Sequence, residues 1–234
     1  MADGETGGMT DERAIGVLIV DDQPLVRRGL ALILRSDPAV EVVGEAGDGA
    51  EAVALAHRLR PDVVVMDIRM PVLDGVAATE RLARELPRCR VLALSTFDMD
   101  EYVVAALRAG ASGFLPKDVS PEDLLHAVRV VHTGEAAVAP RLLSRLISEF
   151  VRAPRRPDPP VARGVAELTP RETEVWRLMA TGLDNAEIAR TMDISVSTVK
   201  NHITNVFGKL AVRDRAQAVI AAYETGLVEA GGRG

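Results

Sequence analysis

The chain has 234 residues and a formal net charge of −6, with 47% hydrophobic, 26% charged and only 3% aromatic residues. This composition excludes disorder of the whole chain and predicts a core of aliphatic side chains. The negative charge excludes a protein that coats nucleic acid by bulk electrostatics, although a local basic surface is still allowed. Cys89 is the single cysteine, which excludes an intrachain disulfide and a multi-cysteine metal site and fits a reducing compartment.

The N-terminal segment 1–13 is polar and rich in glycine. It has neither the basic start nor the apolar stretch of a secretory signal peptide, so we expect a disordered tail. The first apolar run, residues 14–20, is far shorter than the ~20 residues that span a bilayer. These features predict a cytoplasmic protein without a membrane segment.

Residues 14–135 alternate short apolar runs with segments of helical periodicity. This alternation is typical of parallel strands joined by crossover helices, so we predict an α/β domain in the form of a (βα)5 doubly wound parallel sheet. The expected strands are Val17–Val20, Val40–Glu45, Val63–Met66, Val91–Leu94 and Gly113–Leu115. The first, third and fourth are continuous apolar runs, as in strands that helices cover on both faces.

Acidic residues follow two of these strands. Asp21 and Asp22 end the first strand, and Asp67 ends the third. In a doubly wound sheet of order 2-1-3-4-5, an order that we adopt from known sheets of this class, these strands are neighbours at the switch point where ligands bind. Three carboxylates then converge, and an oxygen-only cluster suits a hard cation such as Mg²⁺. The alternative is that each acid is an ordinary loop residue.

A carboxylate beside bound Mg²⁺ can attack a phosphoryl group, because the metal offsets the negative charge of both groups. Asp67 is the best candidate for this nucleophile. Ser95 ends the fourth strand and Lys117 follows the fifth, so a hydroxyl and an ammonium point to the same edge. Both can hold phosphate oxygens, although each alone is also compatible with a loop residue.

The segment 136–164 is expected to be a helical extension followed by a linker. After Phe150 the sequence VRAPRRPDPPVARG is rich in proline and arginine, which predicts an extended linker. We interpret its arginines as solvated charge, with contact to DNA as the alternative.

Residues 165–230 show no strand-like alternation and predict a small all-α domain. Thr169, Pro170 and Glu172 form an N-cap, a first-turn proline and a capping-box acid. A short helix, Ala186–Met192, a tight turn and a longer helix, Thr198–Leu210, then give the spacing of a helix-turn-helix. An ordinary helical bundle is the alternative interpretation.

The longer of these helices lies in a stretch without acids between Asp193 and Asp214. Such a helix is a candidate for insertion into the major groove of DNA. The residues that we expect to reach phosphates or base edges are Ser197, Thr198, Lys200, Asn201, Thr204 and Lys209.

Four segments of the first domain together carry a specific resemblance: VLIVDDQPLVRRGL, VVVMDIRMPVLDG, VLALSTFD and AGASGFLPKD. From about Gly16 to Gly134 the chain resembles the receiver domains of response regulators. The resemblance implies that Asp67 accepts a phosphoryl group from the phosphohistidine of a sensor histidine kinase. Gln23 stands where many relatives have histidine, which removes none of these roles.

The same resemblance implies a metal site and a switch. Mg²⁺ would be held by Asp22, Asp67 and the backbone carbonyl of Arg69, with Asp21 acting through water. Ser95, Phe114 and Lys117 would sense the phosphate, with Phe114 at the position of the family's aromatic switch residue.

The second domain, in the segments LTPRETEVWRLMATGLDNAEIA and STVKNHITNVFGKLAVRDRAQAV, resembles LuxR-type DNA-binding domains. The two domains together resemble response regulators of the NarL/FixJ class, which implies a transcription regulator of a two-component system and not an enzyme. The implied partners are a sensor histidine kinase, double-stranded DNA and a second copy of the chain when Asp67 is phosphorylated. Trp176 replaces the usual aliphatic core residue, and Thr204 lies where some relatives carry a contacting lysine.

Two other functions compete with this interpretation. A phosphatase resembling the haloacid dehalogenases also uses an aspartate at a strand end and Mg²⁺, but it needs a second aspartate two residues on, where this chain has Arg69. A regulator that works without phosphorylation would not need the complete set of acids, Ser95 and Lys117.

Overall fold

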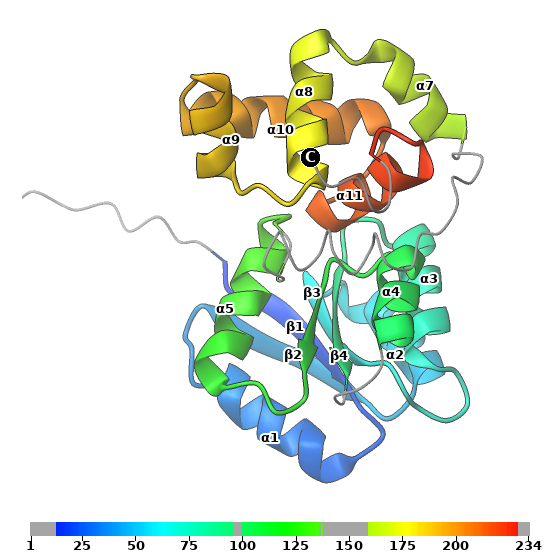
Figure 1. The fold of residues 1–234 in the computed structure, drawn as a ribbon. Coiled ribbons are helices and arrows are strands. Elements are labelled where there is room, and N and C mark those ends of the chain that lie inside the picture. The colour runs from blue at the N-terminus through cyan, green and yellow to red at the C-terminus, as the bar shows by residue number, and fades with distance from the viewer. Residues whose placement is uncertain (1–12, 96–99, 136, 138–158, 229–234) are drawn as a thin grey trace, which may run out of the picture.

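The structure, a computed structural model, describes residues 13–95, 100–135, 137 and 159–228, and contains a parallel sheet and a separate group of helices (Figure 1). The strands are β1 Ile15–Val20, β2 Val40–Ala46, β3 Val63–Asp67, β4 Arg90–Ser95 and β5 Gly113–Pro116. They lie in the order β2-β1-β3-β4-β5, and all paired neighbours are parallel. The predicted doubly wound sheet is therefore confirmed, with strand ends shifted by at most two residues.

Helices cover both faces of this sheet because the strands are apolar on both sides. The helices are α1 Pro24–Leu34, α2 Gly49–Leu59, α3 Gly75–Glu85, α4 Asp100–Ala109 and α5 Pro121–His132. Val17 and Ile19 of β1 pack in one core cluster with α1 and α5, whereas Leu18 and Val20 pack in another with α2 and α3. Alternate residues of one strand thus enter opposite cores, as the pleat requires.

The second group consists of the helices α7 Pro159–Glu167, α8 Pro170–Ala180, α9 Asn185–Met192, α10 Val196–Leu210 and α11 Arg215–Glu224. The predicted capping box of Thr169 and Glu172 begins α8. Asp193, in the left-handed region at φ 54°, ends α9, and the Ser195 hydroxyl caps α10. The predicted helix-turn-helix therefore has the expected helices and turn, and no helix in the described residues is long and apolar enough to cross a bilayer.

The linker prediction was wrong at its C-terminal end. Residues 159–164, expected to be extended, belong to α7, because a helix tolerates prolines such as Pro159 and Pro160 in its first turn. Gly164 lets α7 approach the end of α10, since a Cβ at this position would lie 2.0 Å from the carbonyl oxygen of Lys209. The predicted tail up to residue 12 and the helical extension and linker at 138–158 lie outside the described residues.

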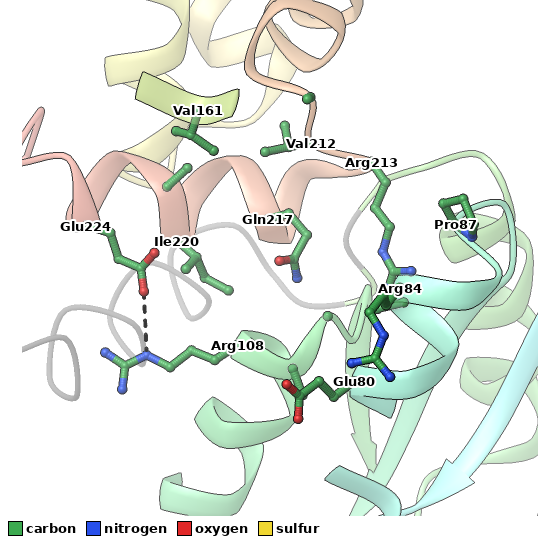
Figure 2. Close-up of a pocket in the computed structure, with 15 residues that line it drawn as sticks. Glu80, Arg84, Pro87, Arg108, Val161, Val212, Arg213, Gln217, Ile220 and Glu224 are labelled. Atoms are coloured by element: carbon green, nitrogen blue, oxygen red, sulfur yellow. Dashed lines mark ion pairs between the residues drawn. The ribbon is translucent and has the colours of Figure 1, made fainter. Parts of the chain in front are cut away.

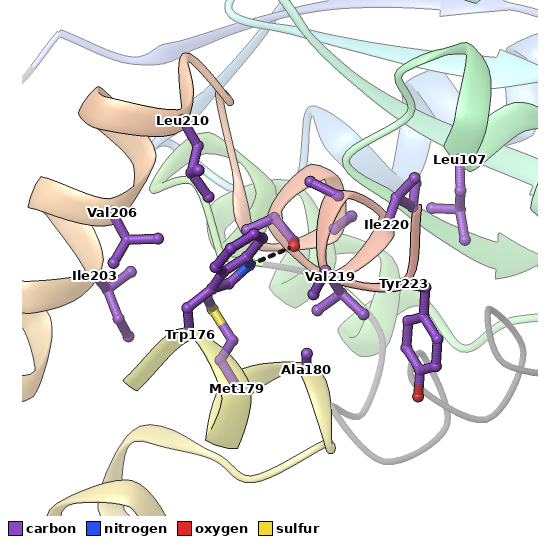
Figure 3. Close-up of a cluster of buried hydrophobic side chains, with 14 of the residues drawn as sticks. Leu107, Trp176, Met179, Ala180, Ile203, Val206, Leu210, Val219, Ile220 and Tyr223 are labelled. Atoms are coloured by element: carbon purple, nitrogen blue, oxygen red, sulfur yellow. Dashed lines mark hydrogen bonds between the residues drawn. The ribbon is translucent and has the colours of Figure 1, made fainter. Parts of the chain in front are cut away.

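One apolar core runs from the sheet domain into the helical domain (Figure 3). Leu107 of α4 and Ile220 and Tyr223 of α11 belong to the same buried cluster as Trp176 of α8. Trp176 is fully buried, and its Nε1 donates a hydrogen bond to the carbonyl oxygen of Ala218 at 2.8 Å. Helix α11 is therefore packed between α8 and α4, which joins the two parts of the chain.

Candidate functional site

The predicted acidic residues meet at one edge of the sheet. Val20 of β1 pairs with Met66 of β3, so that Asp21 and Asp67, the next residues, lie side by side. Asp21 and Asp67 are buried, and Asp22 is exposed beside them. One oxygen atom from each of the three carboxylates lies within 4.8 Å of the others. The sequence prediction that these three acids converge is borne out by this geometry.

Lys117, the residue after β5, reaches this acidic cluster. Its backbone N–H donates to the carbonyl oxygen of Ser95 at 2.8 Å, which fixes the start of the loop after β5. Its Nζ lies 2.7 Å from Oδ2 of Asp21 and 2.8 Å from Oδ2 of Asp67. One ammonium therefore bridges two buried carboxylates that belong to different strands.

The charges of this site are incompletely balanced. Burial raises the pKa of Asp67 above its ordinary value and repulsion from Asp21 adds to this, while the hydrogen bond and charge of Lys117 oppose it. Burial alone would lower the pKa of Lys117, but its hydrogen bonds to both carboxylates prevail and raise it. Three carboxylates face one ammonium, so the oxygen donor set fits a further hard cation.

Two of the three residues predicted to sense the phosphate, Ser95 and Phe114, lie on β4 and β5. Ser95 ends β4 and is half-buried, and Phe114 of β5 pairs with Ala93. The half-buried ring of Phe114 packs against the core cluster that contains α4 and α11. Phe114 is therefore in contact with the apolar core that links the sheet to the helical domain.

Helix α10 presents a polar face on its exposed side. Ser197, Lys200, Asn201 and Thr204 are exposed there, while Val199, Ile203, Val206 and Leu210 are buried on the opposite side. Helix α11 lies between α10 and the sheet domain (Figure 1). Asn205 shares the exposed polar face and was missed in the sequence, where its spacing of four residues from Asn201 was the available signal.

Four of the predicted contact residues of α10 form hydrogen bonds within the protein. The Ser197 hydroxyl is hydrogen-bonded to the Ser195 hydroxyl at 2.7 Å, and the Thr204 hydroxyl donates to the carbonyl oxygen of Lys200 at 3.0 Å. The Thr198 hydroxyl is hydrogen-bonded to the Ser195 hydroxyl at 2.8 Å, at the cap of the helix. Lys209 donates to the buried carboxylate of Glu172 at 2.7 Å. A contact from Lys209 to DNA would therefore compete with an ion pair that holds α10 to α8.

A buried polar network connects the two parts of the chain, and sequence reasoning missed it. The carboxylate of Asp214 is fully buried and accepts a hydrogen bond from the Ser112 hydroxyl at 2.6 Å. Arg90 lies 3.4 Å from the same carboxylate. On α11, Gln217 donates to the carbonyl oxygens of Leu107 and Ala111 at 2.8 and 3.2 Å. These bonds attach the start of α11 to the end of α4.

Comparison with protein-family models gives two matches. Residues 17–129 match the response regulator receiver domain, and residues 166–222 match the LuxR family of bacterial regulatory proteins. The transcriptional regulatory protein YxjL of Bacillus subtilis is 41% identical over 216 residues, which cover 92% of this chain and 98% of that protein. The response regulator VraR of Staphylococcus aureus is 40% identical over 215 residues, with coverage of 92% and 99%.

Solved structures agree with these matches. The receiver domain of a response regulator, NarL, of Mycobacterium tuberculosis has a TM-score of 0.51 and 38% identity, and covers 52% of this chain and 98% of that one. A structure of RcsB dimers bound to DNA has a TM-score of 0.52 and 26% identity, with coverage of 92% and 100%. The chain therefore belongs to the NarL/LuxR family of two-component response regulators, in which a receiver domain is joined to a LuxR-type helix-turn-helix DNA-binding domain.

Proposed function

We propose that this response regulator is switched by phosphorylation of Asp67. The observation that carries the proposal is the bridge from Lys117 to Asp21 and Asp67, with Asp22 beside it. An oxygen of Asp67 would form a bond to the phosphorus of the kinase's phosphohistidine, while the P–N bond breaks and the nitrogen keeps its electron pair. Lys117 is then in place to hold an oxygen of the transferred phosphoryl group.

Mg²⁺ is the proposed cofactor of this transfer. Asp22, Asp67 and the backbone carbonyl of Arg69 would hold it, with Asp21 acting through water, because their oxygens are the donors that a hard cation prefers. When bound, the ion would offset the charges of the Asp67 carboxylate and the phosphoryl oxygens. The dehalogenase-like phosphatase lacks support, since Arg69 cannot serve as its general acid.

In the structure the DNA-binding domain is docked on the receiver domain, with α11 packed against α4. Phosphorylation would act on this docked arrangement through α4. Ser95 ends β4, the strand next to Asp67, and Phe114 packs against the core cluster that contains α4 and α11. The carbonyl oxygens of Leu107 and Ala111 accept hydrogen bonds from Gln217 of α11. A movement of α4 would break these bonds and release the DNA-binding domain. Raising the fraction of released molecules from ~1% to ~99% requires about 5.5 kcal/mol of differential stabilisation. Phosphorylation would supply one part of this free energy, and dimerisation would supply the other.

The released form is proposed to bind paired half-sites of double-stranded DNA as a homodimer in the cytoplasm, with α10 in the major groove. The exposed face formed by Ser197, Lys200, Asn201, Thr204 and Asn205 supports this, and the related RcsB binds DNA as dimers. We place the receiver domain at residues 14–135 and the DNA-binding domain at 165–230, to which α7 adds residues 159–164.

The first experiment treats the full chain with a small phosphodonor and Mg²⁺. We expect one hydroxylamine-sensitive phosphoryl group per chain, no phosphorylation of Asp67→Asn, and slower phosphorylation of Asp22→Asn with weaker Mg²⁺ binding. Asp118→Asn is the matched control, because this acid follows Lys117 but is exposed and outside the cluster. Stoichiometric phosphorylation of Asp67→Asn would show that another residue is the acceptor.

A second measurement distinguishes phosphorylation-dependent regulation from the alternative that works without it. Phosphorylation should increase DNA affinity and change the scattering of the free protein in solution. If both are unchanged while Asp67 is fully phosphorylated, the chain regulates DNA by another route.

A further inference from the structure

A cleft of about 430 Å³ lies between the receiver and DNA-binding domains (Figure 2). Its walls come from α3 and α4 on one side and from α7, the turn before α11 and α11 itself on the other. Three arginines line the cleft, Arg84, Arg108 and Arg213, together with the apolar residues Val212 and Ile220. The cleft therefore combines charged hydrogen-bond donors with an apolar wall.

Arg213 is the most deeply placed of these arginines, with 13% of its side chain exposed. Its Nη1 donates to the carbonyl oxygen of Cys89 at 3.4 Å, whereas its Nη2 is buried and has no hydrogen-bond partner among the described residues. Gly110, at φ +112°, leaves room for this group, because a Cβ there would lie 3.0 Å from Nη2. A donor without a partner at this depth is costly unless a ligand accepts from it.

The positive charge around Arg213 is also poorly compensated. Nε of Arg213 and Nη1 of Arg90 lie 3.6 and 3.4 Å from the same oxygen of Asp214, so that two guanidinium groups share one carboxylate. Burial lowers the pKa of Arg213, and the charge of Arg90 acts in the same direction while Asp214 opposes it. An anion in the cleft would relieve this excess charge.

The other arginines extend the basic surface to the mouth of the cleft. Figure 2 shows Arg213 reaching from the turn before α11 toward Arg84 of α3. Arg108 lies 4.0 Å from Glu224, and its Nε forms no hydrogen bond within the part of the chain that the structure describes. Glu80 and Glu224 are the acids of the lining. The side chain of Arg84 is 66% exposed and pairs with Glu85 at 3.2 Å, whereas Arg213 shares the single carboxylate of Asp214 with Arg90.

We propose that this cleft binds a small phosphorylated molecule, with its phosphate between Arg84 and Arg213 and its apolar part against Val212 and Ile220. Guanidinium groups match phosphate oxygens in charge and in the planar geometry of their donors. Because both domains line the cleft, the ligand binds the docked arrangement and stabilises it. This regulation would not involve the acidic site, because Asp21, Asp22 and Asp67 do not line the cleft.

The test is calorimetric titration of the full chain, carrying Asp67→Asn in a buffer with EDTA so that the acidic site takes up neither metal nor phosphate. The probes are AMP, inorganic phosphate and adenosine, which separate the phosphate from the apolar part. We expect saturable binding of AMP, weaker binding of phosphate and no binding of adenosine. Arg84→Gln and Arg213→Gln should each weaken AMP binding about tenfold, the equivalent of one charge-assisted hydrogen bond.

Arg81→Gln is the matched control, because Arg81 belongs to the same helix but pairs with Glu85 outside the cleft. Arg84→Gln decides the outcome if Arg213→Gln disturbs docking, since Arg84 makes its ion pair with Glu85 within α3. The proposal is wrong if AMP does not bind saturably, if adenosine binds as tightly as AMP, or if Arg81→Gln weakens binding as much as Arg84→Gln.

Discussion

Replacing Asp214 by asparagine should loosen the attachment of the DNA-binding domain to the receiver domain. Asparagine keeps the shape of the side chain and an oxygen that can cap α11 at the N–H of Gln217, now 3.0 Å away. It removes the charge that Arg90 and Arg213 share. The variant therefore separates the electrostatic role of this residue from its role as a helix cap.

The expected cost follows from the burial of the three groups. Removing one partner of a buried ion pair costs ~3–5 kcal/mol. Arg90 keeps 20% of its side chain exposed and Arg213 keeps 13%, so water can solvate them in part, and we expect about 3 kcal/mol, at the lower end of that range. This corresponds to a roughly hundredfold shift of the equilibrium from docked to undocked molecules.

Small-angle scattering of the unphosphorylated variant measures this shift as an increase in the radius of gyration, and its DNA affinity should rise in parallel. Asp48→Asn is the matched control, since Asp48 also caps a helix, α2, but lies away from α11. Ser112→Ala removes only the hydrogen bond to Asp214 and should cost about 1 kcal/mol. A scattering profile and a urea unfolding curve of Asp214→Asn identical to those of the parent would refute the assigned role of this carboxylate.

Three further predictions concern the DNA-binding domain. Hydrogen bonds from Lys209 and from the Thr169 backbone lower the pKa of Glu172 from 4.5 to about 2. The ionised Glu172 therefore contributes fully to the free energy of unfolding above pH 4.5, and this contribution is lost as the pH falls toward 2. Glu172→Gln should reduce the free energy of unfolding at pH 7 by about 1–3 kcal/mol and flatten its pH dependence in this window, and urea titrations at several pH values that show an unchanged profile would contradict this. Trp176→Phe leaves the carbonyl oxygen of Ala218 without its side-chain donor and should destabilise the chain by about 1–3 kcal/mol in thermal unfolding, and a variant as stable as the parent would show that this bond contributes nothing. Lys200→Ala should weaken DNA binding by about 1–3 kcal/mol if Lys200 contacts a base, or reduce the salt slope by about one if it contacts a phosphate, and unchanged affinity and slope would remove Lys200 from the interface.

The sheet and the acidic site were predictable because their signals are local in the sequence. Continuous apolar runs such as Val63–Met66 mark strands covered on both faces, and the acid that follows each run must lie at the same edge once the order of strands is known. Asp67 and Lys117 are 50 positions apart, but each is tied to the end of a strand, so that the sheet brings them together. The strand order itself was adopted from known sheets, and the structure confirms it.

The docking of the two domains was not predictable in this way. Ser112 and Asp214 are 102 positions apart and belong to different domains, so no periodicity or motif relates them. The packing of the final helix, α11, against α4 and α8 likewise has no signal in the local sequence. Helix α7 was not predicted because its sequence begins with prolines. Its packing on the end of α10 at Gly164 is a tertiary contact that the local sequence does not indicate.

Because α11 is buried against α4, the stability of the docked arrangement should depend on temperature. Ile220 and Tyr223 of α11 lie in the same buried cluster as Leu107 of α4, so separation of the domains exposes apolar surface to water and raises the heat capacity. The free energy gained by burying apolar surface becomes smaller on cooling. The hydrogen bonds of Asp214 and Gln217 between the domains do not weaken in this way. Cooling should therefore shift the equilibrium of the chain from docked toward undocked molecules.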